Sequence, residues 1–465
     1  MTSSPIATRP DAPSQCRPAA PPVRARLSSI VAAGAALGAA LLLFGTLVAC
    51  RDKGQEPGAT SGGGAVETTY YDPATKTLRE SEGEVRFGLR LGEWTFWHRN
   101  QSVAKKGRYD EQGRETGEWI QFHPNQLEKA RVTFVEGKLE GESREWHPNG
   151  SLREKGRYAA GKKVGVWESF HEGGEPDATA TWVDGLLDGE ATGWYPDGTL
   201  RERAKFRAGG LVGVVEAFHS NGSPAARKTM DDQGRPFGEA REWYPDGKDK
   251  SSKRYDSEGR EHGLEVAYHP NGSIASLRTW EAGKLVGLSR GWHDNGQLAY
   301  EGSYVDGQRQ GLFRSYHVGG ARQTVELFDQ GRRNGMSRNW FTEGQPNTYV
   351  AFVNDKPIGL MQQWFPNGKR RVYSTVDGPR ITGLSFEWTE DGALFEEVSG
   401  HYDGAQLVRP PDAADLALAE ELAADPTPRP LTVEVPDPLA DVEALEALPA
   451  PLPMLPTPSP SDSDR

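Results

Sequence analysis

A unit of 24–25 residues recurs thirteen times between Gly92 and Gly392, and this period constrains the fold more than any other feature of the chain. Each unit opens with a glycine and carries an aromatic residue five positions later. A fixed period of this size is typical of a repeat array, in which each unit packs only on its neighbours. The thirteen aromatics, which we call the ladder aromatics, are Trp97, Phe122, Trp146, Phe170, Trp194, Phe218, Trp243, Tyr268, Trp292, Tyr316, Trp340, Trp364 and Trp388.

Each ladder aromatic is followed by a turn, often with proline, and in many units the turn contains Asn-Gly or Asp-Gly. These pairs tolerate the positive φ angles of tight hairpins. A polar run then leads to a second aromatic, such as Tyr304, with a further glycine three residues on at Gly307. We expect two strands of roughly six residues per unit, and the short connections favour antiparallel neighbours.

The predicted fold is all-β: an elongated, twisted antiparallel sheet of about thirteen tandem two-stranded repeats, with disordered ends. Alternation places each ladder aromatic on one face with the residues two and four positions before it. In the later units the residue four before is apolar, as at Leu288, whereas the opposite face is small or polar, as at Ser289 and Gly291. We therefore expect the face of the ladder aromatics to be half-buried and the opposite face to be wet.

Two parts of the unit resemble a known family. Residues 304–312 fit a Tyr-x-x-Gly-x-x-x-Gly spacing, and residues 292–296 fit an aromatic-turn half. In both the chain resembles the variant form of the MORN (membrane occupation and recognition nexus) repeat, which is common in bacterial envelope and antitoxin-like proteins. The resemblance covers residues from about 67 to 404. The standard eukaryotic form of the repeat has a central Gly-x-Gly. In this chain the second of these glycines is usually replaced.

The N-terminal residues have the pattern of an export signal. A basic segment precedes an apolar run from Ile30 to Val48, and the run ends in Leu47-Val48-Ala49-Cys50, which resembles a bacterial lipobox. The resemblance implies cleavage before Cys50 and attachment of acyl chains there, which would anchor the chain to a membrane of the bacterial cell envelope. The alternative is an uncleaved single-span helix. In either case the basic segment stays inside, so the repeats lie outside the cytoplasm.

We therefore divide the chain into a lipoprotein signal peptide (1–49), a flexible Gly-rich tether (50–66), a MORN-like β-repeat array (67–404) and a disordered acidic, Pro-rich tail (405–465). The tail contains twelve acidic and three basic residues, a net charge of −9 out of −12 for the chain. Such a composition predicts disorder. Two stretches, 412–424 and 439–448, have the pattern of transient helices. The second has leucines and a valine that a partner groove would accept, although a solvated spacer explains the tail equally simply.

Histidine has an unusual distribution, because eight of the ten directly follow a ladder aromatic. Equivalent residues of successive units lie roughly 9–10 Å apart, whereas zinc ligands converge on one ion at about 2.0–2.1 Å. We therefore interpret the position as one that requires a flat ring, and we expect no metal and no cofactor. The eight are His98, His123, His147, His171, His219, His269, His293 and His317.

No catalytic motif stands out, so the chain is predicted not to be an enzyme. There is no nucleophile elbow, phosphate loop or dinucleotide fingerprint. Several acidic residues share the slot after the opening glycine, as at Glu93 and Glu118, which is typical of a solvated surface. The net charge of −12 argues against nucleic acid as a partner.

Three functions remain open. The first is a protein-binding scaffold or adaptor at the envelope, of which an immunity or antitoxin-like role is a special case. The second is a binder of peptidoglycan, glycan or lipid headgroup, suggested by the thirteen tryptophans. The third is a hydrolase of envelope polymers, which no sequence motif supports. Replacement of Trp292 with Ala is expected to cost about 3 kcal/mol or more if the ladder aromatics are buried.

Overall fold

The computed structural model describes residues 64–430, and the chain divides into two compact units. We call residues 1–234 the N-terminal unit and residues 235–465 the C-terminal unit. The prediction of an all-β fold of antiparallel strands is confirmed in both. The expected signal peptide, Cys50 and the stretch 439–448 lie outside the described residues. Within the described range, no helix has the length and apolar character needed to cross a membrane.

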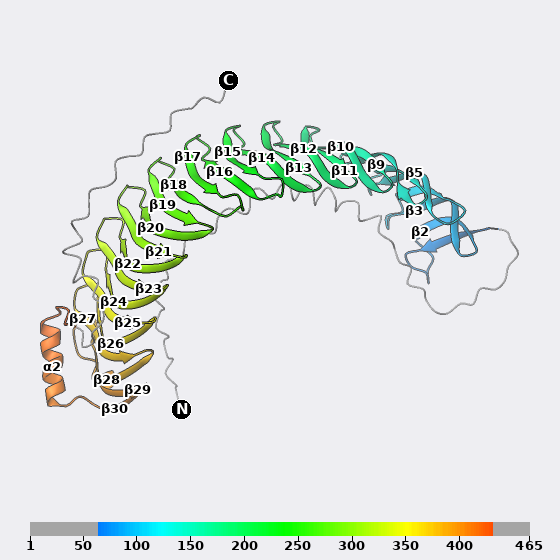
Figure 1. The fold of residues 1–465 in the computed structure, drawn as a ribbon. Coiled ribbons are helices and arrows are strands. Elements are labelled where there is room, and N and C mark those ends of the chain that lie inside the picture. The colour runs from blue at the N-terminus through cyan, green and yellow to red at the C-terminus, as the bar shows by residue number, and fades with distance from the viewer. Residues whose placement is uncertain (1–63, 431–465) are drawn as a thin grey trace, which may run out of the picture. The chain divides into compact units, whose positions relative to one another are not determined.

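Consecutive strands of the N-terminal unit are neighbours in an open antiparallel sheet (Figure 1). Its strands are β1 (Ala65–Tyr70), β2 (Arg79–Arg86), β3 (Leu89–Trp97), β4 (Val103–Tyr109), β5 (Glu115–Phe122), β6 (Glu128–Val135), β7 (Lys138–Leu139), β8 (Gly141–Trp146), β9 (Leu152–Ala159), β10 (Lys162–Phe170), β11 (Pro176–Val183), β12 (Leu186–Trp194), β13 (Leu200–Arg207), β14 (Gly210–Phe218) and β15 (Pro224–Met230). The array therefore begins at Ala65, two residues before the predicted boundary at 67.

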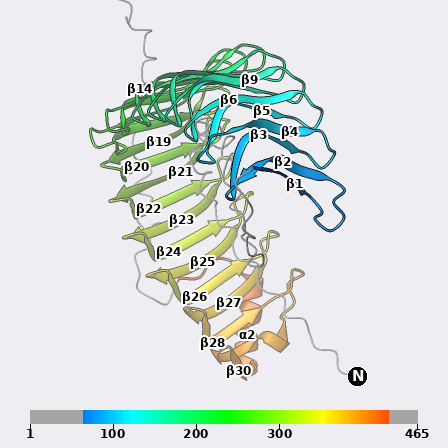
Figure 2. The same ribbon diagram turned by 90° about the vertical axis from the view of Figure 1, so that its right-hand side faces the viewer.

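The C-terminal unit repeats the pattern and ends in a helix, and Figure 2 shows its strands stacked in chain order. Its elements are β16 (Pro236–Trp243), β17 (Asp249–Tyr255), β18 (Gly263–Tyr268), β19 (Ile274–Glu281), β20 (Lys284–Trp292), β21 (Leu298–Val305), β22 (Gln308–Tyr316), β23 (Arg322–Asp329), β24 (Arg332–Trp340), β25 (Pro346–Val353), β26 (Lys356–Trp364), β27 (Arg370–Asp377), β28 (Arg380–Glu387), η2 (Glu396–Val398), β29 (Gly400–Gly404), β30 (Gln406–Arg409) and α2 (Ala413–Ala424).

Two kinds of turn produce each unit. Asp306 and Gly307 join β21 to β22 with φ of 51° and 81°, the pair of positive angles that a two-residue type I′ hairpin requires. The turn after a ladder aromatic is closed by the backbone, as where His293 N–H donates to the carbonyl of Gln297 at 2.8 Å. Most strands run for eight or nine residues, so they are longer than the predicted six.

The main core contradicts the predicted face assignment. The buried position is the second residue after the opening glycine, and we call the face that carries it the core face. Trp94, Trp119 and Trp167 occupy this position and are almost fully buried, and in the C-terminal unit Ser289 and Ser337 are buried there too. The first and third residues after the glycine lie on the opposite side of the sheet, which we call the second face. Leu288 lies on this face and is 46% exposed.

The physical reason is close packing against the preceding strand. The ring of Trp167 lies on Gly156, where a Cβ atom would meet the ring at 2.1 Å, and its indole N–H donates to the carbonyl of Arg157 at 3.2 Å. Trp94 lies on Gly83 in the same way. Small residues on this face therefore make room for rings, rather than marking a wet surface.

Alternation also fails at the ladder aromatics themselves. Each of the first strands that carry Trp97 to Trp364 has a register shift directly before its ladder aromatic, for example between Phe96 and Trp97. At this point the partner strand has an extra residue, Ala104 in β4. A β-bulge of this kind shifts the two-residue period of the strand that contains the extra residue and locally disrupts the pairing at the ladder aromatic.

The predicted disordered tail from residue 405 is also wrong for its first part. Residues 406–409 form β30, and α2 packs on the sheet through Ala419 and Leu422, which are buried against Phe386 and Trp388. Asp412 caps α2 by accepting hydrogen bonds from the backbone of Ala414 and Asp415. The acidic composition suggested disorder, but this apolar contact and the cap order the helix.

Candidate functional site

The ladder aromatics line one edge of the hairpins at intermediate depth. Eleven of the thirteen are half-buried, and only Trp364 and Trp388 are buried, each at 3% exposure. Trp364 donates its indole N–H to the carbonyl of Pro426 at 2.7 Å, so it is buried because the segment after α2 covers it. In most units the ring of the ladder aromatic is therefore partly exposed to solvent. The sequence did not distinguish this from full burial of the ring.

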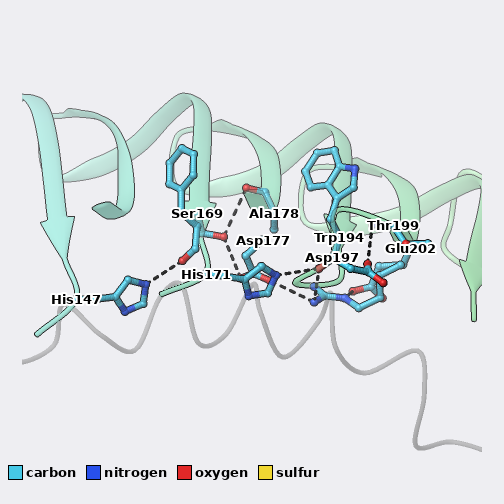
Figure 3. A network of polar contacts seen from close by, with 11 residues as sticks. His147, Ser169, His171, Asp177, Ala178, Trp194, Asp197, Thr199 and Glu202 are labelled. Atoms are coloured by element: carbon cyan, nitrogen blue, oxygen red, sulfur yellow. Dashed lines mark hydrogen bonds and ion pairs between the residues drawn. The ribbon is translucent and has the colours of Figure 1, made fainter. Parts of the chain in front are cut away.

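In nine units the ring after the ladder aromatic connects one unit to the next. Nε2 of His147 lies 2.9 Å from the carbonyl oxygen of Phe170, and Nε2 of His171 lies 3.2 Å from that of Trp194 (Figure 3). A carbonyl oxygen only accepts, so Nε2 of these histidines carries the proton. The hydroxyl of Tyr195 makes the same contact with Phe218 at 3.0 Å. Further contacts of this kind start from Tyr71, His98, His123, Tyr244, His269, His293 and His317.

These contacts explain why histidine recurs at this position. The imidazole or phenol is flat enough to fit before the turn, and it satisfies a backbone carbonyl of the next unit. Among residues 64–430, no group of three His, Cys, Asp or Glu side chains is placed to hold a metal ion. The ring nitrogens are thus committed to joining repeats, a role the sequence indicated only as a flat-ring requirement.

Among the described residues, serine, aspartate and histidine come close together around β10 and β11 (Figure 3). The hydroxyl of Ser169 donates to Asp177 at 3.2 Å, and Nε2 of His171 lies 3.6 Å from the same carboxylate. Arg201 also binds Asp177, at 3.1 Å, and the carbonyl of Trp194 at 3.0 Å. The Ser169 hydroxyl donates to the same carboxylate that Arg201 binds. The arrangement is a cross-unit polar clamp.

A second polar cluster is buried inside the N-terminal unit. Lys163 Nζ lies 2.8 Å from Glu154 and 3.7 Å from the centroid of the Trp167 ring, and both charged side chains are less than a tenth exposed. Burial raises the pKa of Glu154 and lowers the pKa of Lys163. Burial likewise raises the pKa of Tyr158, whose ring packs edge-on against Trp167. The cluster is enclosed by core side chains and so contributes to packing.

Arg370 holds the C-terminal segment onto the sheet. Its guanidinium is 1% exposed and donates to the carbonyls of Leu422 at 3.1 Å and Thr427 at 2.8 Å, as well as to the side chain of Gln362 at 3.1 Å. Burial lowers the pKa of Arg370 to about 10, so the group remains charged at neutral pH. This anchor was missed from the sequence, because its backbone partners Leu422 and Thr427 lie more than fifty residues away.

The second face differs between the units in the slot after the opening glycine. In the N-terminal unit the slot holds exposed Glu93, Glu118, Glu142 and Glu190, and also Val166 and Val214. Some of the glutamates are paired with a neighbouring arginine, as Glu118 is with Arg131 at 3.1 Å. In the C-terminal unit the slot holds Glu239 first, and then Leu264, Leu288, Leu312, Met336, Leu360 and Leu384. The glutamates of this column are exposed, whereas Met336 and Leu360 are buried.

Comparisons with known proteins bear on the repeats. A family model of the MORN repeat variant matches residues 139–160, 187–208 and 285–306. The chain thus contains MORN-variant repeats at three positions, as the sequence pattern predicted, in both units. Each match runs from a first strand through the turn after its ladder aromatic to the end of the second strand, and so includes the Tyr158, Phe206 or Tyr304 position. No curated protein matches the chain.

Two solved toxin structures are similar to the chain at a low level. A TcdB2–TccC3–Cdc42 complex shares 10% identity over 71% of this chain with a TM-score of 0.14. The Tc holotoxin pore of Photorhabdus luminescens shares 10% identity over 70% of this chain with a TM-score of 0.13. The chain spans about a fifth of the length of either structure. Similarities this weak support no conclusion about fold or function.

Proposed function

We propose that this chain is a non-enzymatic, membrane-anchored lipoprotein whose repeat array is a protein-binding scaffold at the cell envelope. The observation that supports a scaffold is the repeated ring-to-carbonyl contact, which fixes each unit on the next and presents equivalent side chains in columns one repeat apart. An extended protein partner can contact several members of such a column at once, which multiplies weak contacts into a stable complex.

The absence of an enzyme activity is part of the proposal and has its own support. The ring nitrogens and the Ser169 hydroxyl are engaged in structural hydrogen bonds. The buried pair Lys163–Glu154 is covered by the side chains of the core face. These polar groups therefore serve structural contacts, and the exposed side chains of the repeats remain for recognition.

The scaffold is tested by crosslinking in living cells. The full-length protein is crosslinked in its native envelope, purified and analysed by mass spectrometry, and a stoichiometric protein partner is expected. A variant with Glu93→Lys, Glu118→Lys and Glu142→Lys alters the column and should lose that partner. A control with Glu111→Lys, Glu136→Lys and Glu172→Lys makes the same charge change at other exposed acids and should retain it. Recovery of no protein partner would contradict the proposal.

The anchor is tested by fractionation of cells that produce the full-length chain. We expect Cys50→Ser to move the mature protein out of the membrane fraction, because the acylated sulfur is lost. Cys16→Ser is the matched control and should leave the protein with the membrane. An unchanged distribution of the Cys50→Ser variant would argue for the single-span alternative.

One observation favours a second candidate, a binder of peptidoglycan, glycan or lipid headgroup. The ladder aromatics are half-buried in eleven units, so part of each ring is accessible, and rings of this kind stack on sugars. Sedimentation of the full-length chain with purified peptidoglycan, and with lipid vesicles, tests it. Binding that Trp292→Ala weakens would support this candidate, and the absence of co-sedimentation would remove it.

A further inference from the structure

The first hairpin of the N-terminal unit has an unusual residue at its tip. Phe87 and Gly88 join β2 to β3 with φ of 53° and 76°, the same pair of positive angles as in the later type I′ turn at Asp306 and Gly307. A bulky side chain rarely adopts a positive φ, because its Cβ crowds the backbone. The fold does not offset this strain by burying the ring, since Phe87 is 86% exposed. Such an outlier calls for a functional explanation.

The other hairpins show that this turn does not require an aromatic ring. Two residues after the Phe87 position most of them have a cation, as at Lys138, whereas the first hairpin has Leu89, which is 44% exposed. Leu186 is an exception, but the turn residue of its hairpin is an aspartate. Among the described residues, the position equivalent to Phe87 is polar or alanine in the other hairpins: Glu136, Ala160, Asp184, Ala208, Ala282, Asp306, Gln330 and Asn354.

Two arginines beside the tip already have carboxylate partners. Arg86 binds Glu84 at 2.9 Å, and on the adjacent turn Arg114 binds Asp110 at 2.9 Å. The distinctive chemistry of the tip is therefore apolar. A small apolar tip flanked by charged groups suits the interfacial region of a bilayer, where aromatic and leucine side chains enter the acyl boundary and the charged groups stay among the headgroups.

The pairing of β1 places the start of the array beside this tip. β1 runs antiparallel to β2, and Ala65 is the registered neighbour of Val85, two residues before Phe87. The chain that comes from Cys50 therefore enters the sheet at the same end of the strands as the hairpin tip. Fourteen residues, 51–64, separate Cys50 from Ala65, and they span at most roughly 50 Å. An anchor at Cys50 would hold the tip within reach of a bilayer, and a weak contact then suffices because the local concentration is high.

We propose that the β2–β3 hairpin tip, Phe87 with Leu89, inserts its side chains into the interface of the membrane to which the chain is anchored. The occupant of this apolar tip is thus a lipid bilayer. The inference rests on the proposed function, because it requires the anchor at Cys50. The anchor keeps the protein on the membrane, and the tip orients the first repeats against the surface, which acyl chains at the end of a tether cannot do.

The experiment is photo-crosslinking of the full-length protein in its native envelope. A photo-reactive amino acid replaces Phe87, and the adducts of the purified protein are identified by mass spectrometry. We expect adducts with lipid acyl chains. The matched control carries the same amino acid at Asp184, and we expect about fivefold fewer lipid adducts there, because four repeats of about 10 Å each separate it from the first hairpin. Equal lipid yields from the two positions, or adducts at the Phe87 position mainly with protein, would overturn the proposal.

A second probe separates loss of the contact from loss of folding. The photo-reactive amino acid replaces Leu89, and Phe87→Asn is introduced beside it. Asparagine is favoured at this turn position, so the variant keeps the turn and removes the ring. Its lipid adducts should fall about fivefold, because most of the inserted apolar area is lost. Ala160→Asn makes the same change in the β9–β10 hairpin and should leave the yield unchanged. An unchanged yield with Phe87→Asn would refute insertion of the ring.

Fractionation of the same cells distinguishes this inference from the proposed anchor. Lipid adducts from protein in the membrane fraction support both. If the protein carrying the probe in place of Phe87 is found in the membrane fraction but gives no lipid adducts, the tip proposal fails and the anchor stands. If that protein is found outside the membrane fraction, as we expect for Cys50→Ser, both proposals fail.

Discussion

The two units share one core face and differ in the use of the second face. In both, a ring or small residue after the opening glycine packs on the preceding strand, as Trp167 does on Gly156 and Phe313 on Gly302. On the second face, the slot after the opening glycine holds mainly glutamates in the N-terminal unit and, after Glu239, leucines and a methionine in the C-terminal unit, where α2 and residues 425–429 cover one end. The core face therefore maintains the repeat, and the second face is free to acquire a specific occupant.

The largest expected effect tests whether stability resides on the core face. Trp167→Ala should lower the free energy of unfolding by about 3–5 kcal/mol, because a buried ring is replaced by a cavity and Lys163 loses its π contact. Trp292→Ala removes a half-buried ladder aromatic and should cost about 1–2 kcal/mol. Denaturation followed by circular dichroism measures both. Equal losses would mean that the ladder, rather than the core face, dominates.

A second substitution tests how the C-terminal unit holds α2. Arg370→Met should destabilise the docked segment by about 3 kcal/mol, because the carbonyls of Leu422 and Thr427 lose a charged donor in a buried site. Hydrogen exchange of α2 should rise while that of β3 to β14 stays constant. Lys356→Met alters an exposed cation of β26 and serves as the control. Unchanged protection of α2 would place the anchor elsewhere.

A third comparison asks whether the core faces of the two units are equivalent. Gly156→Ala should cost about 1–3 kcal/mol, since the new Cβ would meet the Trp167 ring at 2.1 Å. Gly302→Ala should cost a similar amount beside Phe313, where the distance is 2.2 Å. Gly210→Ala, whose Cβ would meet its nearest atom at 3.5 Å, should change little. Thermal unfolding of the three variants would separate a shared constraint from a local one.

A fourth test concerns the connection between repeats. His147→Phe keeps a flat ring but removes the donor to the carbonyl of Phe170, and it should cost about 1 kcal/mol. His293→Phe should have the same effect in the C-terminal unit, where Phe341 already occupies the position naturally. Denaturant unfolding measures both losses of stability. If only one of the two variants is destabilised, the ring-to-carbonyl contact stabilises only one of the two units.

The smallest expected effect is a pH dependence confined to the N-terminal unit. Burial raises the pKa of Glu154 above the ordinary 4.5, so near that value the folded chain binds a proton more readily than the unfolded chain. The free energy of unfolding therefore increases as pH falls through the raised pKa of Glu154, and the increase is complete below pH 4.5. Glu154→Gln removes it. The difference in melting temperature between the wild type and this variant should change in that window and be flat at neutral pH.

The sequence contained enough information for the strands and turns, because the period and the Asn-Gly and Asp-Gly pairs act locally. The aromatic five residues after the opening glycine does not identify the core face, because the buried position is the second residue after that glycine. The informative signal is a pair of residues. One is an aromatic at the second position after an opening glycine, and the other is a further glycine eleven or twelve residues before that aromatic, as Gly107 is before Trp119. The pair is visible only when neighbouring strands are considered together.

The C-terminal helix shows a different limit. Residues 412–424 had a helical pattern, and Asp412 with Asp415 forms the capping box that starts α2. Its docking could not be predicted, because the decisive partners, Arg370 and Gln362, come from strands far earlier in the chain. Composition alone predicted disorder there, because the acidic residues dominate it. It contains no information about the sheet surface on which the apolar side of the helix packs.

The ring-to-carbonyl contacts also bear on how such a chain can change its length. His123 reaches only Trp146, and His147 reaches only Phe170, so each donor recognises a backbone atom that every unit supplies. Removal or duplication of one whole unit would leave every remaining ring facing an equivalent acceptor, whereas loss of part of a unit would not. Genetic recombination in steps of one unit is therefore compatible with folding, and the reach of the scaffold can evolve without a new interface at each step.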